Sequence, residues 1–346
     1  MGFLKKFNTS YKKFKKKFKK FYKTRFGRFV TRFGISFVAT LLICSLGIWG
    51  AYSYVFGGMK MDQSISKEEL GIESQDYHSN KITNIALFGI DTTDSSMQGR
   101  SDSIIIATLD EGRKEIRLSA IQRDTYVPIE GHGKDKINHA YAFGGATLAV
   151  KTLNQNFGTD ITDYAVINFS NLEKVIDALG GIEMEVTETY RKQANIHIKD
   201  LANERGLTPD PIEKAGTQTL SGMQVLGMSR ARYNVGGTGA RSEMHEIILS
   251  ACYAKLKTKN ILEYPAIAKT LLSLVQTTLS SAEVIDVAVK AVMGGYEIRQ
   301  EVFPLAADQP GGSGGKIIGG VWYLTYNYES GNQHIRDFVY NGTLPE

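Results

Sequence analysis

Three charged side chains stand beside predicted strands, at positions where one edge of a sheet could bring them together. Asp91 directly follows the first strand, Asp102 directly precedes the second, and Arg123 lies just after the third. If neighbouring strands run antiparallel, the ends of the first and third strands and the start of the second share one edge. We therefore expect these side chains to form a cluster. The three expected strands are 82–90, 103–109 and 115–121.

The types of these residues suit a site for a phosphate ester and a divalent cation. Two carboxylates are hard oxygen ligands, which Mg²⁺ accepts while it shares its shell with phosphate oxygens. Guanidinium groups donate paired hydrogen bonds to the other oxygens of a pyrophosphate. Three further arginines lie on and after a short predicted helix: Arg230, Arg232 and Arg241. The spacing alone leaves a second interpretation open, in which these charges form surface salt bridges.

Other motifs argue against two common kinds of site. The cysteines and histidines do not have the spacing of a zinc site. The glycine-rich loop 311–316 resembles a phosphate-binding loop, but Ile317 stands where the Ser or Thr that binds magnesium would be.

Helical and strand patterns alternate along the chain, which predicts an α/β fold with a mixed central sheet sandwiched by helices. Apolar residues recur every three or four positions in 145–157 and again in 244–256, as in amphipathic helices. Two capping boxes, beginning at Ser170 and Ser221, mark expected helix starts. Segment 194–215 is polar and without clear periodicity, so we expect a surface insertion there.

The start of the chain differs from the rest in charge. Residues 1–32 carry thirteen of the 41 basic residues and no acidic one, which leaves 28 basic against 36 acidic residues elsewhere. The uncharged run that follows is long enough to span a bilayer, and its basic flank predicts a cytoplasmic N-terminus. A cleaved signal peptide is the alternative, although the basic region is too long for one. We predict a transmembrane helix at 33–57, an extracellular linker at 58–81 and an extracellular domain at 82–346.

Aromatic residues recur every three or four positions within the basic segment 1–32, with lysines between them. A helix would place the aromatic rings on one face and the lysines on the other. Such a segment could bind nucleic acid. Beside a membrane, however, an anionic leaflet attracts each basic residue by about 1 kcal/mol. We therefore expect an amphipathic cytoplasmic stub that lies on anionic membrane lipids and binds no nucleic acid.

Several motifs, in this order, resemble the LytR–CpsA–Psr family, and the resemblance covers about 82–256. They are LFGID at 87–91, GRSD at 99–102, QRDTY at 122–126, KINHAY at 136–141, DALGG at 177–181, and Arg230 with Arg232. The resemblance implies an α/β sandwich on the cell membrane of a Gram-positive bacterium. It also implies a phosphotransferase that moves teichoic acid or capsular polysaccharide from a polyprenyl-pyrophosphate carrier to peptidoglycan.

The same resemblance implies roles for individual residues. Asp91 and Asp102 would hold Mg²⁺, and Asp102 would also take part in catalysis together with Arg123. The pyrophosphate would be held by four arginines, namely Arg123, Arg230, Arg232 and Arg241. The apolar core between the sheet and its helices would open into a pocket for the polyprenyl tail.

The chain departs from the family pattern at four positions, where it carries Thr93, Thr238, Met244 and His245. The usual residues at these positions are an arginine, a carboxylate, an arginine and a glutamine. These departures leave an alternative function open, that of a non-catalytic binder of polyprenyl-pyrophosphate lipids or a cell-envelope regulatory protein.

Overall fold

The computed structural model describes residues 24, 40, 43–62, 65–66, 68–72, 81–92, 97–231, 237–260, 262–312 and 314–345, without the side chains of 237–241 and 312. The chain forms two compact units, Met1–Gly57 and Gly58–Glu346. In the first unit, residues 43–56 form a helix. Among the described residues, no helix has both the length and the apolar character needed to cross a membrane. The predicted stub 1–32, apart from Thr24, and part of the predicted span 33–57 lie outside the described residues.

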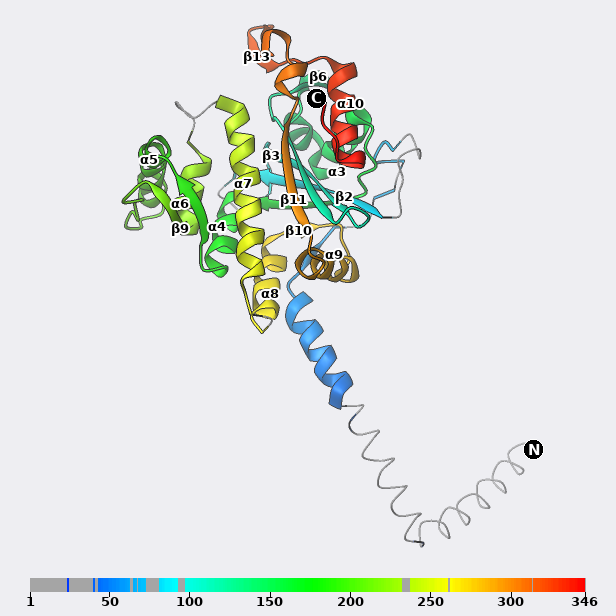
Figure 1. The fold of residues 1–346 in the computed structure, drawn as a ribbon, viewed down its shortest axis with the longest axis vertical. Helices are drawn as coiled ribbons and strands as arrows, with labels where there is room; N and C mark the ends of the chain where they lie inside the picture. Colours follow the sequence, from blue (N-terminus) through cyan, green and yellow to red (C-terminus); the bar gives the residue numbers. More distant parts are fainter. Residues whose placement is uncertain are drawn as a thin grey trace, which may run out of the picture. The chain divides into compact units, whose positions relative to one another are not determined.

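The second unit is built on a seven-stranded mixed sheet (Figure 1), in which the strands follow the order β1-β10-β7-β2-β3-β4-β11. Its centre is antiparallel, because β3 pairs in that sense with both β2 and β4. β7 and β11 lie parallel to β2 and β4, respectively. The sheet strands are β1 (Lys60–Met61), β2 (Ile82–Ile90), β3 (Ser101–Asp110), β4 (Glu115–Ile121), β7 (Asp163–Asn168), β10 (Gln276–Thr277) and β11 (Glu297–Phe303). The predicted mixed sheet and its central hairpin are confirmed.

Helices cover both faces of this sheet. They are α3 (His139–Phe157), α4 (Phe169–Ala178), α5 (Glu188–Glu204), α6 (Gly222–Ser229), α7 (Gly237–Lys257), α8 (Tyr264–Leu274), α9 (Ser281–Met293) and α10 (Tyr328–Arg336). The described residues also form three two-stranded sheets: β5 (Tyr126–Ile129) with β6 (Gly133–Lys136), β8 (Ile182–Val186) with β9 (Gly216–Leu220), and β12 (Gly315–Ile318) with β13 (Val321–Leu324). In the second of these sheets, α5 connects the two strands.

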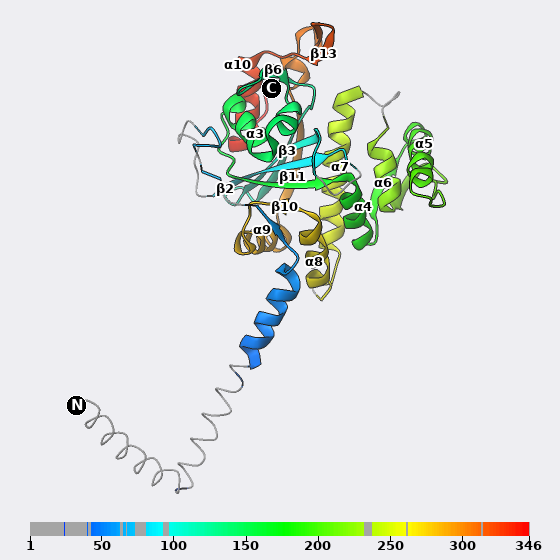
Figure 2. The same ribbon diagram turned by 180° about the vertical axis from the view of Figure 1, so that it is seen from behind.

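Side chains of β3 alternate between the two faces of the sheet and pack against the helices on each face. Ile104 and Ile106 are buried in a core that includes Leu153 of α3. Ile105 packs on the other face, in a cluster with Leu249 of α7. Successive side chains of a strand point to opposite faces, so a strand with only apolar residues in succession is buried on both faces. The sheet is therefore the middle layer of the unit. Figures 1 and 2 show α3 and α10 on one side of it and α4 and α7 on the other.

Three local predictions were wrong. Segment 194–215 was expected to be a surface insertion, but its first part belongs to α5, which continues to Glu204 and buries Ala194, Ile198 and Leu201. The helix start expected at Ser170 is instead capped by Asn168, whose side chain accepts a hydrogen bond from the backbone of Asn171. The helix expected at 145–157 begins at His139 and is kinked at Gly144 and Gly145. By contrast, the capping box at Ser221 is confirmed.

The segment predicted as a linker contributes a strand to the sheet. Lys60 and Met61 form β1, which pairs with β10 at the edge. The next residue, Asp62, donates its backbone N–H to Thr277 O at 2.8 Å and accepts a hydrogen bond from Tyr164 Oη at 2.6 Å. The chain is thus fastened to the folded unit within a few residues of Gly58.

Candidate active site

The rim of the central hairpin carries a cluster of charges, as the strand pairing predicts. A cavity of about 340 Å³ opens there. It is lined by Asp91, Arg100, Asp102, Arg123, Asp124, Lys136 and Asn138. Asp91, Asp102 and Arg123 were expected to meet, and the antiparallel pairing of β2, β3 and β4 does bring them to one cavity.

A break in strand register places Asp102. Gly89 lies opposite Ser103 and Ile90 lies opposite Ser101, so Asp102 is the extra residue of a β-bulge. A bulge re-aims the side chain that it carries. Asp102 therefore lines the charged cavity and is buried, while Ser103 next to it lines an apolar pocket.

Arg123 is held between two carboxylates. Its Nη1 lies 2.8 Å from Asp102 Oδ2, and its Nε lies 3.4 Å from Asp124 Oδ2. Burial acts to lower the pKa of this guanidinium, but the two carboxylates outweigh burial and raise it. Lys136 Nζ binds the other oxygen of Asp124 at 2.7 Å. The guanidinium thus stays charged and its orientation is fixed before any ligand binds.

Asp124 and Lys136 were missed as cavity residues, although both belong to motifs that the sequence displays. Lys136 ends β6, which pairs with β5. The Ile137 backbone N–H donates to Thr125 O at 2.9 Å and so brings this hairpin back to the cavity. Lys136 and Asp124 are twelve positions apart and meet across a hairpin. Such a contact leaves no periodic pattern in the sequence. In the sequence, only the resemblance of the motifs at 122–126 and 136–141 to those of the family indicated that these residues belong to one site.

Arg230 joins the cluster from the end of α6. Its Nη2 lies 3.6 Å from Asp91 Oδ1, and its guanidinium carbon lies 6.0 Å from the centre of the Phe169 ring. Arg232 and the side chain of Arg241 lie outside the described residues. Their predicted roles stay predictions.

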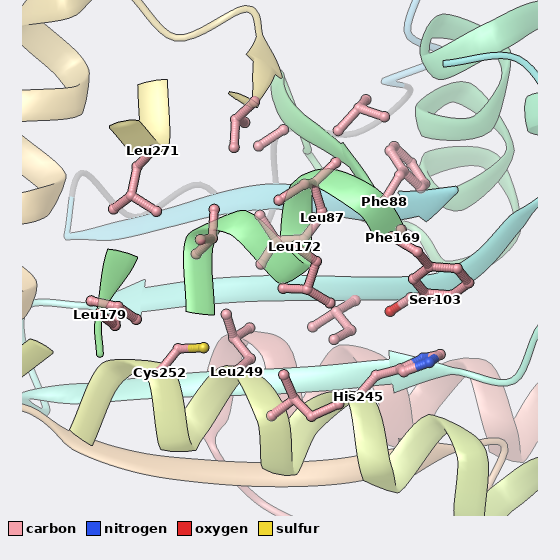
Figure 3. A pocket seen from close by; sticks show the side chains of 18 of the residues that line it. Leu87, Phe88, Ser103, Phe169, Leu172, Leu179, His245, Leu249, Cys252 and Leu271 are labelled. Atoms are coloured by element: carbon pink, nitrogen blue, oxygen red, sulfur yellow. The ribbon is translucent and has the colours of Figure 1, made fainter. Parts of the chain in front are cut away.

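An apolar pocket of about 300 Å³ lies beside the charged cavity, between strands β7, β2 and β3 and helices α4, α7 and α8. Figure 3 shows Ser103 and His245 toward one end of it and Leu179, Leu271 and Cys252 toward the other. Phe169 lines this pocket beside His245, and its ring also lies close to Arg230, which pairs with Asp91 of the charged cavity. This arrangement would accept a long apolar chain that ends in an anionic group.

Helix α7 also buries a carboxyl group against the sheet. Glu246 Oε1 accepts a hydrogen bond from the backbone N–H of Ala120 at 3.1 Å. Burial raises the pKa of Glu246 to about 9, and the hydrogen bond from Ala120 only partly offsets this. The nearby carboxylate of Glu301 raises the pKa further. Glu246 is therefore neutral at pH 7.

A model of the LytR_cpsA_psr family matches residues 52–335, most of the chain. The chain belongs to this family. It is 33% identical over 258 residues to the polyisoprenyl-teichoic acid–peptidoglycan teichoic acid transferase TagU of Enterococcus faecalis, which covers 73% of this chain and 79% of that protein.

Two solved structures share the LytR–CpsA–Psr fold. One, described as TagT bound to LIIa-WTA, has a TM-score of 0.62 at 23% identity and covers 82% of this chain and 98% of that one. The other is described as family protein YwtF (TagT) with bound octaprenyl pyrophosphate lipid. It has a TM-score of 0.57 at 21% identity and covers 81% of this chain and 98% of that one.

Two of the four departures from the LytR–CpsA–Psr pattern are interior positions of α7. Met244 is buried in the core that this helix shares with β8 and α4, and His245 lines the apolar pocket. The usual arginine and glutamine would place more polar groups there. Thr93 and the side chain of Thr238 lie outside the described residues.

Two carboxylates at the rim are of the type that a hard cation prefers. Asp91 and Asp102 both line the charged cavity. The described part of the chain holds no group of three or more His, Cys, Asp or Glu residues that could form a metal site. Mg²⁺ suits such a sparse site, because it is usually bound by one or two carboxylates while water and phosphate oxygens fill the rest of its shell.

Proposed function

We propose that this protein transfers a glycopolymer, teichoic acid or capsular polysaccharide, from a polyprenyl-pyrophosphate carrier to peptidoglycan. One observation carries the proposal: adjacent residues of β3 line an apolar pocket and a charged cavity, Ser103 the pocket and Asp102 the cavity. A polyprenyl pyrophosphate has this same division between an apolar tail and an anionic head. The names of the similar TagU and of the lipid-bound TagT structure support the same chemistry.

In the proposed reaction, a sugar hydroxyl of the acceptor attacks the phosphorus that carries the glycan. The new P–O bond forms as the bond to the lipid phosphate breaks, and polyprenyl phosphate leaves. The attacking and leaving oxygens lie roughly in line, so catalysis depends on positioning and on charge stabilisation. Arg123 and Arg230 would stabilise charge on the phosphoryl oxygens. Asp102 would accept the proton of the attacking hydroxyl.

The metal and the other arginines complete the proposal. Asp91 and Asp102 would hold Mg²⁺, which would neutralise charge on the pyrophosphate. Arg232 and Arg241 would contact the same pyrophosphate. We also propose that residues 33–57 anchor the chain in the cell membrane, with the stub 1–32 on anionic lipids inside and the main domain outside. The charge pattern and the uncharged run support this topology.

The test is turnover. Full-length protein, in detergent, would receive a polyprenyl-pyrophosphate-linked glycan and a peptidoglycan oligosaccharide. Polyprenyl phosphate and the glycan–acceptor adduct would be measured over time. We expect both products in equal amounts, with a sharp loss in Asp102→Asn. Tight donor binding without turnover would replace this proposal with that of a non-catalytic lipid binder.

A further inference from the structure

The hairpin formed by β12 and β13 exposes apolar side chains where nothing in the fold requires them. Trp322 is 40% exposed, and Ile317 and Val321 beside it are also exposed. Ile317 lies directly opposite Trp322 across the two strands. Because Ile317 and Trp322 are paired, their side chains lie on the same face of the hairpin. Exposed apolar side chains grouped in this way mark a candidate binding surface.

The hairpin is fixed to the segment that carries Arg123. The backbone N–H of Leu324, the last residue of β13, donates to Asp124 O at 2.9 Å. The ring of Tyr323 lies with its centre 4.7 Å from that of Tyr126, the first residue of β5. The position of the hairpin relative to the charged cavity is thus set by the backbone and by an aromatic contact.

One lysine separates the aromatic rings from the cavity. Lys136 lines the cavity and binds Asp124. Its Nζ lies 5.9 Å from the Trp322 ring centre and 5.8 Å from that of Tyr323. This is within the range of cation–π attraction. A molecule resting on Trp322 would therefore be continuous with a molecule in the cavity.

The order of the strands indicates from which side the acceptor would approach the charged cavity. The apolar pocket lies along β7, β2 and β3, while the hairpin is joined to the chain that follows β4. The two features flank the cavity from different sides along the sheet. If the lipid phosphate leaves toward the apolar pocket, an in-line attack requires the nucleophile to arrive from the other side. That is the side of the hairpin.

We propose that Trp322 forms a platform for a sugar ring of the peptidoglycan acceptor and so places its hydroxyl at the phosphorus. A pyranose presents C–H bonds on one face and hydroxyls around its edge. That shape suits an indole ring, which offers a large rigid apolar surface. The inference rests on the proposed transferase function and adds the subsite for its second substrate.

The experiment compares three variants of the full-length protein: Trp322→Ala, Trp322→Phe and, as a control, Leu262→Ala. Leu262 is 84% exposed and lies before α8, away from the hairpin. Initial rates would be measured while the acceptor oligosaccharide and the lipid-linked donor are varied separately. Acceptor binding would also be measured by calorimetry in the absence of donor.

We expect Trp322→Ala to raise the KM for the acceptor about tenfold, which corresponds to about 1.4 kcal/mol, while the KM for the donor stays unchanged. Trp322→Phe should recover most of the loss, because it keeps an aromatic face. Leu262→Ala should match the wild type. An unchanged acceptor KM in Trp322→Ala would overturn the proposal. So would a rise confined to the donor KM, which would assign the platform to the donor glycan.

The binding measurement separates this proposal from the transferase function. If the wild type binds the acceptor and Trp322→Ala weakens that binding, the platform stands even where no turnover occurs. If the wild type forms product but Trp322→Ala changes neither acceptor binding nor the acceptor KM, the proposed transferase function is retained and the proposed role of Trp322 is refuted.

Discussion

Replacing Arg123 with lysine distinguishes a site for pyrophosphate from a surface salt bridge. The guanidinium reaches Asp102 through Nη1 and Asp124 through Nε. A lysine offers one compact ammonium in place of this planar fork, and Lys136 already occupies one oxygen of Asp124. Arg123→Lys can therefore keep one of the two contacts at most. A hydrogen bond to a charged group contributes about 1.5–3 kcal/mol to the free energy of unfolding, and the variant should lose about one such bond.

The effect on activity should be larger than a salt bridge alone can cause. Loss of one donor that stabilises charge in the transition state lowers the rate by about 10- to 1000-fold, or about 1.4–4 kcal/mol. We expect kcat for polyprenyl phosphate release to fall within this range. The assay would run at saturating donor and well below the melting temperature of the variant, so that unfolding does not contribute.

Arg113→Lys is the matched control. Arg113 pairs with Asp110 at 2.9 Å, in the turn at the other end of the same hairpin, and its side chain is 48% exposed. Asp110 is buried but keeps its contact with Arg117 at 2.9 Å, and the pair lies away from the charged cavity, so turnover should stay near that of the wild type. Equal turnover in Arg123→Lys and Arg113→Lys would refute the assignment of Arg123 to the pyrophosphate.

Three further predictions concern the metal, the pH and the stub. Asp91→Asn and Asp102→Asn each remove one of the carboxylates lining the cavity, so turnover should drop sharply and require more Mg²⁺; a wild-type Mg²⁺ titration in both variants would contradict the site. The raised pKa of Glu246, about 9 against about 4.3 when unfolded, means that the folded state keeps a proton that the unfolded state loses. Its contribution to stability should therefore fall as pH rises from 5 to 8, by at most about 1.4 kcal/mol per pH unit. Chemical denaturation should show Glu246→Gln gaining stability relative to the wild type over that range, and a constant difference would be evidence against a neutral Glu246. A peptide of residues 1–32 should bind anionic vesicles and lose binding steeply with salt, because exposed charges are screened within about 8 Å at physiological ionic strength; equal binding to neutral vesicles would rule out the electrostatic mechanism.

The central strands and the rim cluster were predictable because two simple patterns agree there. Apolar runs bounded by charged or turn residues gave β2 and β4 at their observed limits. The short break between β3 and β4 implied a hairpin, and the hairpin in turn implied that Asp91, Asp102 and Arg123 would share an edge. Local sequence and strand pairing were sufficient for this part of the site.

Other features depend on contacts that leave little local trace. β1 has two residues, too few for any periodicity, and it exists because β10 offers an open edge. Helix α5 is polar on average, and its buried Ala194, Ile198 and Leu201 form a narrow stripe that charged neighbours obscure. The bulge at Asp102 follows from the register between two strands, which neither strand specifies alone.

The pairing of Lys60 and Met61 with the sheet limits the reach that the proposed membrane anchor would allow. A free linker over 58–81 could extend to about 80 Å at roughly 3.3 Å per residue. With β1 paired to β10, only residues 58 and 59 separate the proposed anchor from the sheet. If residues 33–57 form the proposed anchor, this connection could extend to no more than about 10 Å. So short a tether adds little reach of its own, and the acceptor glycan would then have to come to the protein near the bilayer.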